Sequence, residues 1–94
     1  MIVSFACEQT KRLFNEQKVK HKFLAHHLHE RALAKLQILH AANLITDLNF
    51  PPSNRLKKIQ GTTHTHEIRI NDRYRIYFDW IDEKPHNVKI GDHL

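Results

Sequence analysis

Three side chains in one segment, Arg69, Arg75 and Tyr77, have the types and the spacing to act on a phosphate group. Guanidinium groups donate planar pairs of hydrogen bonds to phosphate oxygens, and a phenol ring offers a surface on which a base can stack. All three residues have the same parity in an alternating polar and apolar pattern, so in strands they point to one face. The pattern predicts a phosphate clamp on the open face of a sheet.

A basic stretch surrounds these residues. Arg55, Lys57 and Lys58 lie just upstream, and residues 55–78 hold six Lys and Arg against two Asp and Glu. The whole chain has a formal net charge of +5, and small basic proteins favour polyanionic partners such as nucleic acid or an acidic protein segment. The positive charge is therefore concentrated where we expect the open face, and Arg73 at a turn is a further candidate contact.

The second half of the chain has the period of two that is typical of strands. Two alternating runs cover residues 67–71 and 74–80, and the turn pair Asn71-Asp72 separates them. A second turn over residues 82–85 leads to a final short strand around residues 88–90. We expect a small, mainly antiparallel sheet that has one apolar face for helices to cover.

The first half must supply those helices. Residues 2–5 suggest an opening strand, Glu8 to Gln17 a short helix, and Lys20 to Ala42 a longer helix, on which Lys35 lies away from the apolar side. The longer helix has an apolar stripe at helical spacing, made of Leu24, Leu28, Ala32, Leu36 and Leu39. We therefore predict an α+β fold with two N-terminal helices packed on one face of the sheet.

Length and composition limit the class of protein. The chain has 94 residues, of which 40% are hydrophobic and 27% charged, so we expect one globular domain over residues 1–94. We expect no secretory signal and no membrane association, because the apolar runs are short. The single cysteine, Cys7, cannot form an internal disulfide and suits a reducing cytoplasm.

Several stretches resemble the HigB killer toxins of the RelE/ParE superfamily. They are Pro51-Pro52-Ser53-Asn54-Arg55-Leu56, Gly61, Ile68 to Trp80, Val88 to His93, and the opening Met1 to Phe5. The resemblance covers nearly the whole chain, and Ile68 to Trp80 is its most specific part. The chain departs from the family pattern at Gln60, where Lys is common, at His66, which replaces an aromatic residue, and at Leu94, since the family usually ends in Asp-Tyr-His.

The resemblance implies a RelE/ParE-like fold and ribosome-dependent cleavage of mRNA in the cytoplasm. It also implies a HigA-like antitoxin with a helix-turn-helix domain, which holds the toxin inactive and through which alone the toxin reaches operator DNA. In such cleavage the 2′-hydroxyl attacks its neighbouring phosphate, and neither a metal nor another cofactor takes part. Arg75 and Arg69 then stabilise the pentacovalent phosphate. For the proton transfers we expect His93 as the first candidate, with Lys57, Lys58 and His66 as second candidates.

Other interpretations of the same residues stay open. Arg75 and Arg69 could instead form salt bridges with acidic residues across the sheet, and Tyr77 could simply fill a half-buried position. If Arg75 is an exposed strand residue, its removal should leave the fold intact. At the level of function, the chain could be a ParE-like toxin that acts on gyrase, or a degenerate toxin that binds its antitoxin and cuts poorly.

Overall fold

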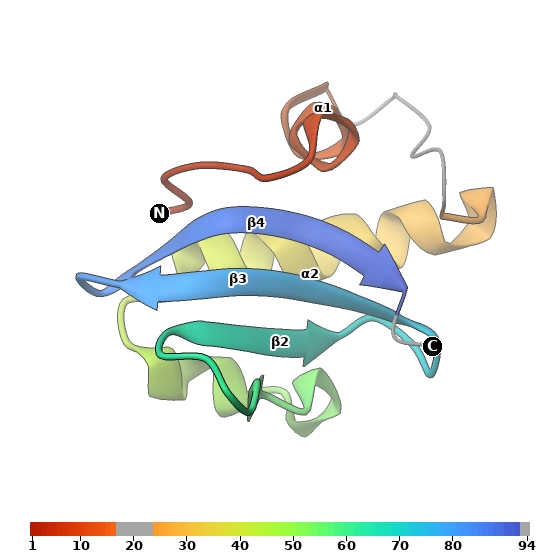
Figure 1. Ribbon diagram of the computed structural model, residues 1–94. Coiled ribbons are helices and arrows are strands. Elements are labelled where there is room, and N and C mark those ends of the chain that lie inside the picture. Colours follow the sequence, from red (N-terminus) through yellow and green to blue (C-terminus); the bar gives the residue numbers. More distant parts are fainter. Residues whose placement is uncertain (17–23, 93–94) are drawn as a thin grey trace.

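The computed structural model describes residues 1–16 and 24–92, and its second half is an antiparallel sheet with the strand order β1-β2-β3-β4. Figure 1 shows α2 along one face of this sheet and α1 beside β4. The elements are α1 (Glu8–Glu16), η1 (His26–Leu28), α2 (His29–Ala41), η2 (Ile45–Asn49), η3 (Pro52–Asn54), β1 (Lys57–Lys58), β2 (Thr65–Arg69), β3 (Tyr74–Ile81) and β4 (Lys84–Asp92). The predicted α+β fold, with two helices and a mainly antiparallel sheet, is confirmed.

The turn at Asn71-Asp72 is confirmed, whereas the predicted turn over residues 82–85 and the predicted short strand around residues 88–90 are wrong in extent, because β4 already begins at Lys84 and runs to Asp92. At the β2–β3 turn, the side-chain oxygen of Asn71 accepts hydrogen bonds from the backbone N–H groups of Arg73 and Tyr74, at 3.0 and 2.7 Å. At the β3–β4 turn, Asp82 and Glu83 have positive φ angles of 53° and 62°. Two consecutive positive φ angles are typical of the tight hairpin turn whose twist matches that of the flanking strands.

The core lies between α2 and the sheet. The apolar parity of the strands is buried here, and Ile68, Ile76 and Val88 have no exposed surface. The predicted helix stripe packs against these residues, and each of its members is at most 9% exposed. The strand residues of the other, polar parity consequently lie on the face of the sheet that α2 does not cover.

The opening segment forms less structure than predicted. Phe5 makes a single parallel bridge to Val88, and backbone hydrogen bonds join Val3 to Pro85 and Ser4 to Val88. The predicted strand over residues 2–5 is therefore wrong as a strand, although its backbone still covers the outer edge of β4. Covering an edge in this way blocks pairing with other chains.

The predicted long helix is wrong in its first part. Ala25 has an extended conformation, with ψ of 139°, and helical structure begins only at η1. Leu24 is nevertheless buried, at 4% exposure, so its apolar spacing reflects burial in the core and not helix. The predicted residues Lys20 to Phe23 lie outside the described part of the chain. None of the described helices is long and apolar enough to cross a membrane.

The prediction that Lys35 lies on a polar face of its helix is also wrong. The residue is only 8% exposed, and its Nζ donates hydrogen bonds to Ser53 Oγ at 3.0 Å and to Asn54 Oδ1 at 2.6 Å. The fully buried Asn54 in turn donates from Nδ2 to the carbonyls of Leu48 and Phe50, both at 3.1 Å. This network ties the proline-containing loop to α2.

Replacing Asn54 tests the importance of this network. Asn54→Ala leaves the Lys35 ammonium with only its bond to Ser53 and removes the donor to two carbonyl groups, so we expect a loss of about 1–3 kcal/mol in the free energy of unfolding. Urea denaturation measures this loss. The control is Asn49→Ala, at an exposed position of the same region. Equal stability of the two variants would show that the network contributes nothing.

Candidate functional site

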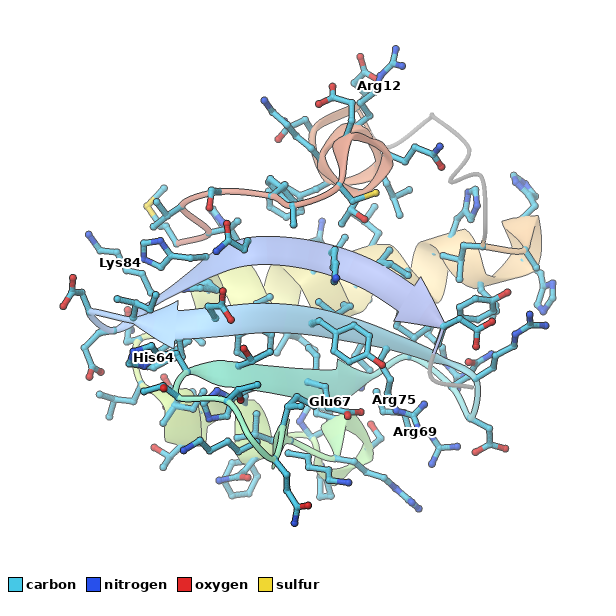
Figure 2. The ribbon with its side chains drawn as sticks, in the orientation of Figure 1. Arg12, His64, Glu67, Arg69, Arg75 and Lys84 are labelled. Atoms are coloured by element: carbon cyan, nitrogen blue, oxygen red, sulfur yellow. The ribbon has the colours of Figure 1, made fainter. Side chains whose placement is uncertain are left out.

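The open face of the sheet carries polar side chains in rows that cross the strands. Residues that are paired across neighbouring antiparallel strands point to the same face. One row contains Lys57, Glu67, Tyr77 and Lys89, and the next row contains Arg69, Arg75 and Gly91. Figure 2 shows Glu67, Arg75 and Arg69 close together at one end of the sheet. The structure therefore places the predicted residues Arg69, Arg75 and Tyr77 in two neighbouring rows of the open face.

Arg75 is held in a fixed position by three hydrogen-bond acceptors. Its Nε donates to Glu67 Oε2 at 2.9 Å, and Nη1 donates to the carbonyls of Asn71 and Tyr74. Among the described residues no such bond involves Nη2, so two N–H donors remain for a ligand. A guanidinium held in this way presents its remaining donors to an anion without further loss of side-chain entropy.

The Arg75 side chain is only 14% exposed and that of Glu67 only 7%. The expectation of an exposed strand arginine is therefore wrong, and the cross-strand salt bridge that was left open as an alternative is present. The pair does not exclude phosphate binding, because it uses only the Nε side of the guanidinium. It does mean that removing Arg75 leaves a buried carboxylate without its partner, which is costly.

Arg69 lies directly opposite Arg75 in the register. Like charges in such a position repel each other. Arg69 Nη2 is paired with Asp72, whose side chain is 95% exposed, whereas Arg75 is paired with the buried Glu67. The two carboxylates offset the repulsion from opposite sides, so both guanidinium groups can lie at the same end of the sheet.

Tyr77 lies over Gly91. A Cβ atom at Gly91 would come within 2.8 Å of the Tyr77 ring, so the absence of a side chain there gives the ring its place beside the Arg75 row. Burial raises the pKa of Tyr77, and the negative charge of Glu67 raises it further. The phenol is therefore neutral near pH 7 and can stack or donate a hydrogen bond, but it is not a base.

The other predicted contact residues are spread around this centre. Lys57 belongs to the row of Glu67, whereas Lys58 is paired with His66, whose ring stacks on Phe78 with a centroid distance of 5.9 Å. Lys58 therefore belongs to the opposite face, and so does His66. Arg55 is exposed after η3 and has a left-handed φ of 45°.

The C-terminal end of the site involves Arg73 and Asp92. Arg73 is exposed and pairs with Asp92 at 2.9 Å. Asp92 is the partner of Tyr74 in the register, next to Arg75. The predicted proton-transfer residue His93 lies outside the described residues, so its role stays a prediction.

Sequence reasoning did not identify Glu67 and Gly91 as part of the site. Glu67 has the same parity as Arg69, which was a usable signal for its place on the open face. Nothing local signals Gly91, because its closeness to Tyr77 depends on how two strands pair. In the described part of the chain, no three His, Cys, Asp or Glu side chains are placed to hold a metal ion together.

The far end of the open face is organised around Asp79. Its two carboxylate oxygens accept hydrogen bonds from Thr65 Oγ1 at 2.6 Å and from Asn87 Nδ2 at 2.9 Å. The bond from Thr65, followed by the bond from Asn87, lowers the pKa of Asp79. Asp79 is four residues from Arg75 along β3, about 13 Å, so this cluster is separate from the arginine pair.

The lowered pKa predicts how Asp79 contributes to stability. A carboxyl group whose pKa is depressed by folding stabilises the protein above its unfolded pKa, about 3.9, and this contribution is lost as the pH falls through the folded pKa. We expect the free-energy difference between the wild type and Asp79→Asn to be constant at neutral pH and to shrink below about pH 4. Denaturation across this pH range measures it, and a difference independent of pH would contradict the assignment.

Comparison with known proteins shows the family to which the chain belongs. A family model described as the RelE-like toxin of the type II toxin–antitoxin system HigB matches residues 3–93. The chain is also 32% identical over 81 residues to Toxin HigB-1 of Vibrio cholerae serotype O1 (strain ATCC 39315 / El Tor Inaba N16961), with 85% of each chain covered. The arginine pair, the hairpin that carries it and the helices behind it therefore belong to a RelE-like HigB toxin of a type II toxin–antitoxin system.

Proposed function

We propose that this toxin is a ribosome-dependent endoribonuclease that cuts mRNA. The observation that carries the proposal is the pair of arginines in direct register on the open face, one of them held by Glu67 and by two carbonyl groups. Such a pair provides fixed positive charge at a point where negative charge develops during phosphoryl transfer. A surface used only for protein contacts does not require a guanidinium in so fixed a position.

In the proposed reaction the 2′-hydroxyl of the RNA loses its proton and attacks the adjacent phosphorus. The bond from phosphorus to the 5′-oxygen breaks, and this oxygen takes up a proton, so that a cyclic 2′,3′-phosphate and a 5′-hydroxyl result. Arg75 Nη2 and the Arg69 guanidinium stabilise the charge on the pentacovalent phosphate. The nucleophile belongs to the substrate, so no step requires a metal or another cofactor.

The remaining predicted residues have supporting roles. Neutral Tyr77 offers its ring as a stacking surface for an RNA nucleobase beside the reacting phosphate. Arg55, Lys57 and Arg73 hold the RNA backbone, and Lys58 binds it from the edge of the sheet. Among the described residues, no imidazole shares the rows of Arg75 and Glu67: His66 belongs to the opposite face, and Figure 2 shows His64 at the far end of the sheet. We therefore keep His93 as the proposed proton-transfer residue, with Lys57, which shares the row of Glu67, as the second candidate.

A toxin of a type II system acts together with a protein antitoxin. We propose that the antitoxin is HigA-like, with a helix-turn-helix domain, and that operator DNA is reached only through it. The proposed targets of the free toxin are the ribosome and its bound mRNA in the cytoplasm. The antitoxin then inhibits either by covering the arginine face or by gripping the helices on the opposite side.

The decisive variant is Arg75→Lys, because a lysine still provides a positive charge for Glu67 but lacks the planar donors. We expect the rate of ribosome-dependent mRNA cleavage to fall about 10²- to 10³-fold, which is typical for loss of one group that stabilises the transition state. The matched control is Arg12→Lys, since Arg12 forms a salt bridge on α1 and lies far from Arg75 in Figure 2. Its cleavage rate should equal that of the wild type.

Arg75→Ala is less informative, because leaving the buried carboxylate of Glu67 unpaired should cost about 3–5 kcal/mol of stability. Each variant must therefore be shown to be folded, by circular dichroism and thermal unfolding, before its activity is compared. Wild-type rates in folded Arg75→Lys would remove Arg75 from the mechanism. A folded wild-type protein that never cleaves mRNA on ribosomes would overturn the proposed activity and favour action on gyrase or a degenerate toxin.

A further inference from the structure

A cavity of about 280 Å³ lies where α2, the loop after η3 and the end of β2 meet. Its lining residues are Arg31, Lys35, Ser53, Arg55, Arg69, Ile70 and Asn71. Four of these residues are cationic and none is acidic. The cavity adjoins the arginine pair through Arg69, and of its other cations only Arg55 is among the residues proposed to hold the RNA backbone.

Lys35 is the buried cation of this cavity. It is 8% exposed, and its hydrogen-bond partners among the described residues, Ser53 and Asn54, are both neutral. An ammonium group has three N–H donors, so these two bonds leave one donor of Lys35 unused. Burial lowers the pKa of Lys35, and the positive charge of Arg31 lowers it further. A buried charge without a counter-ion is costly unless an anion joins it.

The other cations of the cavity add to this excess of positive charge. Arg31 and Arg55 are exposed, and within residues 1–16 and 24–92 neither of them forms a salt bridge. Arg69 has one, with Asp72 on the solvent side. Three side chains of the cavity thus lack a negative partner, and a concave site lined by charge of one sign attracts an ion of the opposite sign.

We propose that this cavity binds a backbone phosphate of RNA, next to the phosphate held by Arg75. This inference rests on the proposed function, because it takes RNA as the ligand. Both phosphate and carboxylate suit arginine donors. Continuity favours RNA: Arg69 belongs both to the cavity and to the row of Arg75, so a strand that crosses the open face reaches the cavity with a neighbouring phosphate.

The test uses a fluorescent 2′-O-methyl oligoribonucleotide, which cannot be cut because its 2′-oxygen is blocked. Its binding is followed by anisotropy over a series of salt concentrations for the wild type, Arg31→Ala, Arg55→Ala and the matched control Arg12→Ala. Loss of one single-strand phosphate contact reduces the slope of log affinity against log salt by about 0.7. We expect this reduction, with affinity about tenfold weaker, for Arg31→Ala and Arg55→Ala but not for Arg12→Ala.

A second measurement does not depend on RNA. Inorganic phosphate should shift the Nε–Hε nuclear magnetic resonance signals of Arg31 and Arg55 in the wild-type protein and leave the signal of Arg12 in place. Absence of a shift at both cavity arginines would overturn the inference. A general shift of all three signals would also overturn it, because it would indicate unspecific screening.

The outcomes separate this inference from the proposed function. Cleavage and RNA binding by the wild type, together with unchanged slopes in Arg31→Ala and Arg55→Ala, would refute the cavity site and leave the nuclease in place. If these variants keep their RNA affinity but bind the antitoxin more weakly, the cavity takes carboxylates of the partner protein and the inference is wrong. If the wild type neither binds the oligoribonucleotide nor cleaves mRNA on ribosomes, both proposals are removed.

Discussion

The ion pair between Arg75 and Glu67 is the interaction on which the open face depends. Arg69 and Arg75 lie directly opposite each other across β2 and β3, and without the Glu67 carboxylate the charge of Arg75 would have no negative partner there. With it, the Nε side of Arg75 is satisfied while the Nη2 side is left for a ligand. A group that is fixed in advance loses little entropy when its ligand arrives.

The same pair couples stability to the proposed activity. Glu67 is a buried carboxylate that tolerates burial because Arg75 is present, so a change in Arg75 affects both the fold and the site. Asp72 does not have this effect on Arg69, since it is almost fully exposed and can be replaced by water. Arg69 and Arg75 look equivalent in the alternating sequence pattern. They differ in that only Arg75 has a buried carboxylate partner that depends on it.

On the helix side of the molecule, the buried charge of Lys35 is held by neutral hydrogen-bond acceptors and not by a carboxylate of the described residues. Lys35 is surrounded by neutral acceptors and by the cations Arg31, Arg55 and Arg69. Hydrogen bonds to Ser53 and Asn54 reduce the cost of its burial but do not neutralise its charge. These bonds also hold the loop that leads to Arg55, so one buried lysine both orders the basic loop and leaves an excess of positive charge beside it.

The sequence by itself determined the two central strands, the turn at Asn71 and the face on which Arg69, Arg75 and Tyr77 lie, because a period of two assigns each strand residue to one side. It misplaced the start of α2, since Leu24 keeps a helical spacing while its neighbour Ala25 is extended. Only the tertiary structure decided which groups meet: Glu67 with Arg75 on the next strand, Tyr77 over Gly91, and Lys35 with Asn54. Such contacts depend on strand register and on the path of a loop, and local periodicity contains no information about either.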